Sequence, residues 1–424
     1  MIRRSTWWRE LSEVYQHSEV QLSAAPGMTG REAKMLPEGW QRRPLSECAK
    51  FVSGGTPNKD TPEFWGGHFP WITAKDMKEL RLNGAGLSLT DAGKEEARVV
   101  PAGSILVLTR GMTLLKDLPV CIANTDVTFN QDVKALLPAK GIDSDFLANQ
   151  LISNKREILD LVDTAGHGTG RLDTDLLKDF AVAIAPLKEQ KRIGKMLMAW
   201  DSAIATTERL LANSCELKQS LMRNLLTPRG RRKGWKTYRL GSLFSERNET
   251  GRADLPLLSI TREEGVILRD DVGRKDTSNE DKSKYLRICP GDIGYNTMRM
   301  WQGVSALSSL EGIVSPAYTI VVPSEKIDVR YAAYLFKLKS MIFTFYRHSQ
   351  GMVSDTWSLK FEHFKKIAVS IPDRAEQDRT VRVLCSVDRV IEALDSHIEE
   401  LRAEKTALMQ QLLTGKRRVR IAKA

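Results

Sequence analysis

Two long stretches of the chain repeat apolar residues with the alternating four-and-three spacing of a coiled-coil seam. In residues 193–225 the seam positions are Ile193, Leu197, Trp200, Ile204, Thr207, Leu211, Ser214, Lys218, Leu221 and Leu225. In residues 380–412 they are Thr380, Leu384, Val387, Ile391, Leu394, Ile398, Leu401, Lys405, Leu408 and Leu412. A seam held over five heptads predicts coiled-coil helices rather than surface helices of a globular domain.

The two stretches are parts of a longer internal repeat. At an offset of 187 residues, positions 172–231 align without a gap with positions 359–418, and 18 of the 60 aligned residues are identical. Polar residues that unrelated amphipathic helices would not share are among them, namely Glu189, Gln190 and Arg192 in one copy and Glu376, Gln377 and Arg379 in the other. The chain is therefore built from two related halves.

Each copy of the repeat begins with a short β-like run, residues 180–186 or 367–373, and its helix is expected to end near Pro228 or Gly415. Roughly 40 helical residues rise about 60 Å. Antiparallel pairing of the two helices is expected, since it puts the segment that precedes each helix at opposite ends of a rod. Lys218 and Lys405 share one seam position, where a polar residue can fix the register of the pair.

The segments before the two helices share little sequence. Both alternate short β-branched or apolar runs with turn signals and shorter helical stretches, which predicts a small α+β domain in each half. Turns at Gly103 and Gly291 are expected to lead into equivalent strands. The fold class is thus α+β, with two α/β domains separated by an antiparallel two-helix coiled coil and related by an internal pseudo-two-fold repeat. The predicted divisions are an N-terminal extension (1–37), domain 1 (38–185), helical region 1 (186–233), domain 2 (234–372) and helical region 2 with a basic tail (373–424).

Composition adds two expectations to this picture, a class of partner and a cellular compartment. The net charge of +11 and the pI of about 9.3 favour a polyanionic partner, above all nucleic acid. Five dispersed cysteines without a CxxC spacing favour a reducing cytoplasm over a disulfide or zinc scaffold. No apolar run reaches the roughly 18–20 residues that a membrane-spanning helix needs, so no membrane partner is expected. The dispersed cysteines also give no reason to expect a metal site.

Several loops combine glycines with the side chains that contact bases and phosphates. The candidate DNA-binding residues are Thr56, Lys59, Thr73, Lys75, Arg110, His167, Thr169 and Arg171 in the first half and Arg262, Asn296, Arg299, Gln302, Gln350 and Ser354 in the second. The tryptophans of these loops, Trp65, Trp71, Trp301 and Trp357, are each expected to be packing residues and not stacking platforms.

Motifs of catalysis are sparse in this sequence. It has no phosphate-binding GxxxxGK[ST] loop, no HExxH and no Pro-Pro-aromatic tetrapeptide of an amino-methyltransferase. Asp132 and Lys134, with Asp126 upstream, form a D-x-K triplet similar to that of metal-dependent nucleases. No catalytic residue is predicted, and a stand-alone nuclease that uses Asp132 and Lys134 is kept as an alternative of a different class.

The chain resembles the specificity subunits of type I DNA restriction–modification systems. The motifs that carry the resemblance are GGTP (54–57), EFWGG (63–67), PWIT (70–73), GDIGYNTMRMWQG (291–303), GIVSP (312–316) and the repeated EQ-x-R and LLT segments, over about residues 36–420. The resemblance implies two target-recognition domains, each reading one half of a bipartite double-stranded DNA target, with the helices fixing the spacing. It also implies that the helices dock two methyltransferase subunits, which hold S-adenosylmethionine and methylate adenine, and that restriction subunits using ATP and Mg²⁺ join them.

Under this resemblance the subunit itself is not catalytic and holds no cofactor. The candidate residues for partner docking and for the coiled coil are Glu189, Gln190, Arg192, Leu197, Trp200, Ile204, Leu211, Leu221 and Leu225 in the first helix and Glu376, Gln377, Arg379, Leu384, Ile391, Ile398, Leu408 and Leu412 in the second.

The sequence departs from the family pattern in two places. The first ~35 residues precede the usual start, at MLPEGW (35–40). Three interpretations of them stay open: a misassigned start, a tag-like tail, or an extra helix with Leu11, Val14 and Tyr15 packed on the rod. The motif around Gln377 is looser than the one around Gln190, which implies a less symmetric partner interface. A specificity chain of a fused or simpler restriction–modification system, in which one partner both cleaves and methylates, also remains open.

Overall fold

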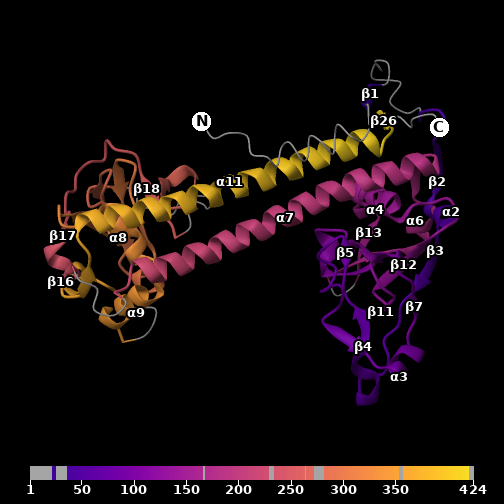
Figure 1. Cartoon of the computed structure of the whole chain (residues 1–424), viewed down its shortest axis with the longest axis horizontal. Coiled ribbons are helices and arrows are strands. Elements are labelled where there is room, and N and C mark those ends of the chain that lie inside the picture. Colours follow the sequence, from indigo (N-terminus) through magenta and orange to yellow (C-terminus); the bar gives the residue numbers. More distant parts are fainter. Residues whose placement is uncertain are drawn as a thin grey trace. The chain divides into compact units, whose positions relative to one another are not determined.

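The computed structural model describes residues 36–165, 168–228, 234–262, 264–271, 281–352 and 357–419, together with the backbone of the short strand β1 (Leu22–Ala24). The chain divides into two compact units, and the colour bar of Figure 1 gives the residue numbers of their segments. Unit 1 comprises Met1–Thr206 and Ile398–Ala424, and unit 2 comprises Thr207–His397. Because the unit boundaries fall inside the two long helices, each of these helices contributes one half to each unit.

The sheets of unit 1 surround a hydrophobic core. One sheet has the strand order β3-β12-β8-β10-β5, with all four residues of the central strand β8 (Ile105–Leu108) buried. The other strands of this sheet are β3 (Ala49–Ser53), β12 (Val133–Pro138), β10 (Val120–Ala123) and β5 (Arg81–Leu82). A second sheet is ordered β6 (Leu87–Leu89), β4 (Trp65–Ile72), β11 (Val127–Phe129) and β7 (Val99–Val100). A third is ordered β13 (Val162–Ala165), β14 (Thr169–Leu172) and β9 (Arg110–Gly111).

Short helices complete unit 1. They are α2 (Leu45–Cys48), α3 (Asp91–Glu95), α4 (Ser144–Ser153), α5 (Lys155–Leu159) and α6 (Thr174–Asp179), with 3-10 turns η1 (Pro62–Phe64) and η2 (Met112–Leu115). The carboxylate of Asp143 accepts the Phe146 N–H at 3.1 Å and so caps α4. Figure 1 shows α4 lying next to the long helix α7 (Leu187–Leu225). The approach is close at Gly194, where an added Cβ would lie 3.0 Å from both Asp143 Oδ1 and Asp145 Cβ.

Unit 2 has a similar frame with shorter strands. Its main sheet is ordered β17 (Phe244–Glu246), β24 (Tyr318–Pro323), β21 (Ile293–Asn296) and β22 (Ser305–Leu307). Two strand pairs are β18 (Leu258–Ile260) with β19 (Val266–Leu268) and β20 (Leu286–Ile288) with β23 (Gly312–Val314). The helices are α8 (Val329–Phe336), α9 (Lys339–His348) and α10 (Phe361–Phe364), with 3-10 turns η3 (Leu240–Ser242), η4 (Arg269–Asp271) and η5 (Met300–Gln302).

Equivalent strands in the two units confirm the expectation about the glycine turns. Gly103 and Gly291 both have positive φ, at 84° and 92°, and they lead into β8 and β21, each a central strand of its sheet. The Gly103 N–H donates to Ala123 O at 2.8 Å, and the Gly291 N–H donates to Ser308 O at 2.9 Å. Two domains with little sequence in common therefore repeat one main-chain frame.

A second feature of this frame is the strand pair that precedes each long helix. In unit 1, β15 (Ala181–Ile184) pairs antiparallel with β2 (Gln41–Pro44), and in unit 2, β25 (Ala368–Ile371) pairs antiparallel with β16 (Lys236–Arg239). These strands are the β-like runs that the repeat predicted.

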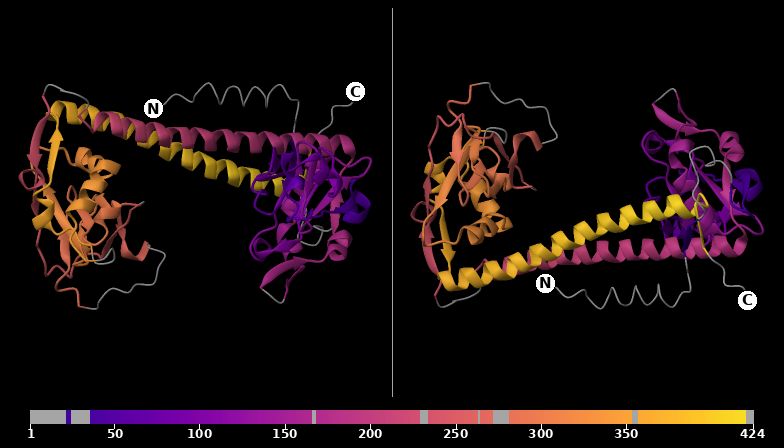
Figure 2. Two further views of the ribbon diagram at one scale, coloured as in Figure 1. Left: turned by 90° about the horizontal axis from the view of Figure 1, so that it is seen from below. Right: turned by 90° about the horizontal axis from the view of Figure 1, so that it is seen from above.

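The two long helices have matching lengths and matching ends. Both α7 and α11 (Arg374–Leu412) have 39 residues, and their first and last residues differ by the repeat offset of 187. In each unit, the half of α7 lies beside the half of α11 and runs in the opposite direction (Figures 1 and 2). The α+β fold class and the antiparallel helix pair are thus confirmed.

The N-terminal extension contributes a strand to unit 1. The β1 backbone pairs antiparallel with β26 (Arg417–Val419), which follows α11 directly. Leu11, Val14 and Tyr15, the residues of the helix that was considered for this extension, lie outside the described residues.

Candidate nucleic-acid interface

Two of the candidate arginines in unit 1 meet across neighbouring strands. Arg110 in β9 and Arg171 in β14 are direct register partners in an antiparallel pair. Residues opposite each other in such a pair project to the same face of the sheet. Both side chains are exposed, so the structure joins two candidates that lie far apart in the sequence into one basic surface. Thr169 lies on the same strand as Arg171, and His167 lies outside the described residues.

Lys134 in β12 belongs to the same charged neighbourhood. Its Nζ donates a hydrogen bond to Ser53 Oγ at 2.8 Å. Burial lowers the pKa of Lys134, and the positive charges of Arg110 and Lys178 lower it further, while Asp132 acts in the opposite direction. The sequence marked Lys134 only as part of a nuclease triplet, but in the structure it lies among cations.

The carboxylate of Asp132, the other member of that triplet, accepts a hydrogen bond from the Asn130 amide at 3.0 Å. Within the described parts of the chain, no three His, Cys, Asp or Glu side chains are grouped so that they could hold a metal ion.

The remaining candidates of unit 1 belong to a loop region around two tryptophans. Trp65 and Trp71 pack edge to face at 5.0 Å between ring centroids, and the Trp71 indole donates to Gly55 O at 3.1 Å. Trp71 is buried, which agrees with a packing role. Lys59 and Lys75 are exposed on this loop region.

The two threonines of this loop region make hydrogen bonds inside the chain. The Thr56 hydroxyl donates to Gln131 Oε1 at 2.5 Å, and the Thr73 hydroxyl donates to Asp76 Oδ2 at 2.8 Å. Burial raises the pKa of Asp76, but hydrogen bonds from the Gly86 N–H and from Thr73 outweigh it and lower the pKa below its usual value. Thr73 therefore helps to shape the turn.

The candidates of unit 2 come from two segments that aromatic rings bring together. Trp301 packs against Trp357 at 5.2 Å, and Tyr346 of α9 packs against the other side of the cluster, 4.8 Å from Trp357. Residues 296–302 and Gln350 are thereby placed near each other, with Arg299 and Gln350 exposed. Asn296 Oδ1 accepts the Met298 N–H at 3.0 Å, and Gln302 lies in η5. Arg262 is exposed in another loop, and Ser354 lies outside the described residues.

The sequence reasoning did not single out the exposed apolar residues beside these candidates. Met298 is 45% exposed and Met352 is 99% exposed in unit 2, and Met112, next to β9 in unit 1, is 71% exposed. Phe343 and Tyr346 of α9 are also exposed, at 58% and 39%. The available signal was the helical spacing of the segment that contains α9, which puts these two rings on the face opposite to the buried Met341 and Phe345.

The repeated glutamine of helical region 1 forms the joint between domain 1 and its helix. Gln190 is 1% exposed, and its Oε1 accepts the Asp143 N–H at 2.8 Å. Its Nε2 donates to Gly141 O at 3.1 Å and to Ala185 O at 2.7 Å. All three bonds go to main-chain atoms, so Gln190 holds the backbone before α4 against the start of α7.

The counterpart in helical region 2 makes the same joint in unit 2. Gln377 is fully buried, and its Oε1 accepts the Asp328 N–H at 2.7 Å. Its Nε2 donates to Lys326 O at 3.2 Å and to Pro372 O at 2.9 Å. Both glutamines were proposed among the docking or coiled-coil residues, and their place is inside the chain and not on a docking face.

The Glu189 side chain is likewise buried and bonded within unit 1. It is 1% exposed, accepts a hydrogen bond from the Trp40 indole at 3.1 Å, and pairs with Arg418 at 2.9 Å. A buried carboxylate needs such partners to offset the loss of its hydration. Arg418, part of the basic run after α11, is thus held by a contact within the chain.

Most of the other seam and docking candidates are at least partly covered by the helix pair. Leu197, Leu384, Ile398 and Leu412 are buried, whereas Trp200, Ile204, Leu211, Leu221, Leu225, Ile391 and Leu408 are partly buried. Arg192 and Glu376 are partly exposed and Arg379 is exposed.

Unit 2 carries an exposed apolar edge along its helix pair, formed by Leu210, Leu217, Val383 and Val390, which are 42–53% exposed. Each of them lies one residue before a seam position, and in an antiparallel pair these positions of both helices border one side of the seam. At the repeat offset of 187, the other copy has His397, Glu404, Met196 and Ala203 in their place. The apolar edge is therefore a feature of unit 2.

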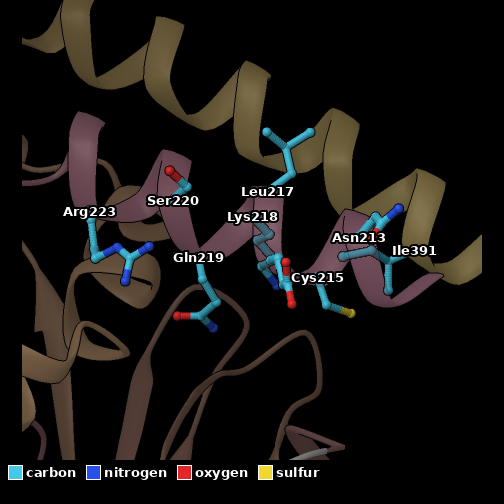
Figure 3. Close-up of a pocket in the computed structure, with 9 residues that line it drawn as sticks. Asn213, Cys215, Leu217, Lys218, Gln219, Ser220, Arg223 and Ile391 are labelled. Carbon is cyan, nitrogen blue, oxygen red and sulfur yellow. The ribbon is translucent and has the colours of Figure 1, made fainter. Parts of the chain in front are cut away.

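A shallow pocket in unit 2 lies along α7. It is lined by Asn213, Cys215, Glu216, Leu217, Lys218, Gln219, Ser220, Arg223 and Ile391 (Figure 3). Figure 3 shows Leu217 pointing to the opposite side of α7 from Cys215 and Gln219. The pocket lining brings together no nucleophile, base and orienting group of the kind that covalent catalysis needs.

The chain matches known proteins over different lengths. Residues 37–213 match the family model of the type I restriction modification DNA specificity domain. A type I restriction enzyme specificity subunit of Escherichia coli is 30% identical over 178 residues, which are 41% of this chain and 44% of that relative. Another, from Methanocaldococcus jannaschii, is 23% identical over 416 residues, which are 91% of this chain and 94% of that relative. The chain thus spans less than half of the first relative and most of the second.

Solved structures show the same fold. The S subunit of the type I restriction–modification system of M. genitalium has a TM-score of 0.56 and 13% identity, with 90% of this chain and 98% of that one covered. A chain from a structure concerned with complex assembly and conformational transition of a type I system has a TM-score of 0.56, 15% identity and coverages of 90% and 99%. The resemblance inferred from the sequence motifs is confirmed. Among the described helices, none is long and apolar enough to cross a membrane.

Proposed function

We propose that this chain is the DNA-sequence specificity subunit of a type I restriction–modification complex, because its residues 37–213 match the family model of the type I restriction modification DNA specificity domain. Each unit presents one target-recognition domain, and each domain reads one half of a bipartite double-stranded DNA sequence. The chain performs no chemistry and works in the cytoplasm, where its partners modify or cut the DNA.

The observation that carries this proposal is the repeated joint. Gln190 and Gln377 make the same three main-chain hydrogen bonds, and the frame around Gly103 and Gly291 is repeated as well. The exposed loops on this repeated frame differ between the units in both charge and aromatic content. A protein that recognises two different half-sites needs this combination, because the constant frame holds both domains alike while the divergent loops contact different bases.

Binding of DNA should combine two kinds of contact. Exposed cations such as Lys59, Lys75 and Arg299 supply contacts to phosphates, so affinity falls as the salt concentration rises. Polar side chains of the loops supply contacts to base edges in the major groove, and these contacts carry the specificity. The partner enzymes then act on a target adenine, which must leave the base stack to be methylated.

The proposed partners are two methyltransferase subunits, which dock on the helical regions and hold S-adenosylmethionine, and restriction subunits that use ATP and Mg²⁺. The apolar edge of unit 2 is the surface that suits one methyltransferase subunit, since exposed apolar residues aligned along one edge mark an interaction surface. In unit 1, Glu404 makes the corresponding edge more polar, so the second copy of the partner meets a different surface.

A map of methylated adenines tests the proposal. Cells with the gene should show a gapped, bipartite methylation motif that disappears when the gene is deleted and returns on complementation. A contiguous motif, or a map that the deletion leaves unchanged, would sink the specificity-subunit assignment. Purified chain incubated alone with DNA and Mg²⁺ should leave the DNA uncut and unmethylated. Cleavage that disappears in a D132N variant would favour the nuclease alternative instead.

The composition of the complex purified from cells separates the type I system from a fused or simpler system. We expect the complex purified from cells to contain separate methyltransferase and restriction chains. A single partner chain that both cleaves and methylates would favour the fused system while leaving the role of this chain as the specificity subunit intact.

A further inference from the structure

The paired arginines of unit 1 share their face with one carboxylate, because the exposed Asp163 of β13 is the register partner of Arg171 on the other side of β14. Like charges opposite each other in an antiparallel pair destabilise the sheet. In the described part of the chain, neither Arg110 nor Arg171 forms an ion pair, and both are exposed. Two exposed arginines therefore share this face with one aspartate, and the face keeps a positive charge that an anion can neutralise.

Lys134 adds a third cation near this face, from the neighbouring five-stranded sheet. It lies on β12, which begins directly after Asp132. The main-chain oxygen of Asp132 accepts the N–H groups of Thr109 and Arg110. The main-chain contact brings β12 next to Arg110, and the positive charge of Arg110 lowers the pKa of Lys134 in agreement with it.

Two further carboxylates near this face, those of Asp173 and Asp175, are engaged with other donors. Asp173 caps α6 by accepting the N–H groups of Asp175 and Leu176, and Asp175 pairs with Lys178 at 2.7 Å. They reduce the local charge, but their hydrogen bonds hold them at the start of α6 and away from a bridge to the arginines.

Unit 2 offers an internal comparison, because the frame around this face is repeated. The Leu172 N–H donates to Thr109 O at 2.9 Å, and the equivalent Leu359 N–H donates to Thr297 O at 2.8 Å. These bonds align Thr109 with Thr297 and Leu172 with Leu359. The residue after Thr297 is Met298, in the place of Arg110, and the residue before Leu359 is Ser358, in the place of Arg171.

The third position is also neutral in unit 2. Lys134 pairs with Val107 in the register of β12 and β8, and Thr319 pairs with Tyr295 in the equivalent register of β24 and β21. The Thr319 hydroxyl shares a hydrogen bond with Thr297 at 2.9 Å and is buried. The basic face is therefore built into one recognition domain and absent from the other.

We propose that Arg110, Arg171 and Lys134 form a phosphate-binding triad, by which recognition domain 1 grips the DNA backbone at its half-site. Domain 2 lacks the triad and meets the other half-site at this position with Met298, Ser358 and the neighbouring aromatic cluster. The inference rests on the proposed function, and it makes the two half-sites unequal in their dependence on salt.

The test measures binding of the complex of this chain with its methyltransferase partners to a duplex that carries the methylated motif, and to an unrelated duplex. For wild type, R110Q/R171Q and R110K/R171K, affinity is measured over a series of salt concentrations. Loss of two phosphate contacts should reduce the slope of log affinity against log salt by about 1.8. The lysine variant should keep the wild-type slope, since it keeps both charges.

A matched control removes the same charge elsewhere in unit 1. Arg98 and Lys140 are both exposed, and R98Q/K140Q should leave the slope unchanged. Because phosphates are common to all duplexes, R110Q/R171Q should weaken binding to the target and to the unrelated duplex by similar factors. Loss confined to the target duplex would overturn the phosphate assignment and show base reading instead.

The outcomes also separate this inference from the proposed function. If the wild-type complex fails to prefer the target duplex over the unrelated one, the proposed function has failed. If it prefers the target and R110Q/R171Q retains the wild-type slope, the phosphate triad is wrong while the specificity role stands.

Discussion

Lys218 Nζ on α7 lies 2.6 Å from Asp388 Oδ1 on α11 in unit 2. In unit 1, the residues related to them by the repeat make the same contact with the helices exchanged, since Lys405 of α11 pairs with Asp201 of α7 at 2.5 Å. The shared seam lysine thus has a partner in both units. A cation in the seam that meets an anion on the opposite helix favours one register of an antiparallel pair over its neighbours.

Reversal of the unit 2 pair should preserve the helix packing. K218D alone places two carboxylates together and should lower the free energy of unfolding by about 1–2 kcal/mol, between the values for surface and buried pairs. K218D/D388K should recover most of that loss, as measured by urea denaturation. Lys405 and Asp201 are unchanged in both variants and serve as the internal reference. A double variant no more stable than K218D would show that the pair does not fix the register.

Removal of either joint glutamine should destabilise the unit that contains it. Q190A leaves the Asp143 N–H and two carbonyl groups without their partner, and Q377A does the same in unit 2, so each should cost about 2–3 kcal/mol. Q219A, at an exposed position of α7, is the control and should change stability by less than about 0.5 kcal/mol. Unchanged urea midpoints for Q190A and Q377A would contradict the structural role.

Lys134 should strengthen DNA binding and, at the same time, lower the folding stability of the free chain. Because its pKa is lowered in the folded state, the charged form is disfavoured there. This penalty is fully present below the folded-state pKa and is relieved as the pH rises through that value towards 10.5, the ordinary value of the unfolded chain. We therefore expect K134M to be at least as stable as wild type at pH 7, to lack the wild-type gain in stability at alkaline pH, and to bind DNA more weakly.

The matched variant for this prediction is K140M, which removes an exposed lysine of the same unit. It should alter neither the pH dependence of stability nor DNA binding. A K134M chain that is clearly less stable than wild type at pH 7 would show that the Ser53 hydrogen bond outweighs the cost of the charge.

The apolar edge of unit 2 should be needed for docking of one methyltransferase copy. L210D/L217D places two charges on an exposed surface, so the isolated chain should keep its stability while the complex loses one methyltransferase subunit in native mass measurements. The control A212D/S202D places charges at exposed positions of α7 outside the edge and should leave the complex whole. Full complexes with L210D/L217D would rule out the edge as a docking surface.

The two long helices should set the gap in the DNA target. Seven residues inserted between Thr206 and Thr207 and another seven between His397 and Ile398 preserve the heptad phase of both helices and add about 10 Å to each. The methylated motif should keep both half-sites and gain about 3 base pairs between them. A motif with its original gap would contradict the role of the helices, and an insertion in one helix alone should abolish methylation.

Local periodicity was sufficient to predict the helical part of the fold. The seam pattern and the repeat gave α7, α11 and their matching ends, because heptad spacing and helix stops depend on residues close in the sequence. The strands after Gly103 and Gly291 were predictable for the same reason, since a turn with positive φ strongly favours glycine.

Contacts between distant segments were beyond the reach of such patterns. Nothing in the spacing of Arg110 and Arg171 indicates that β9 and β14 pair in that register, or that β12 brings Lys134 near that face. The shared motif at Gln190 and Gln377 was visible, but its burial was not. Identity between two copies shows that a residue is needed in both, and it does not tell whether the partner is another protein or the chain's own backbone.

In each unit, the glutamine at the joint, Gln190 or Gln377, forms these hydrogen bonds with main-chain atoms. Each glutamine recognises one N–H and two carbonyl oxygens, groups that nearly every amino acid supplies, so the side chains of the adjoining domain can change without loss of the bonds. A whole domain with the same backbone path could be transplanted onto either helix. Genetic recombination between related chains could then generate a new DNA specificity in one step, with the scaffold inherited unaltered.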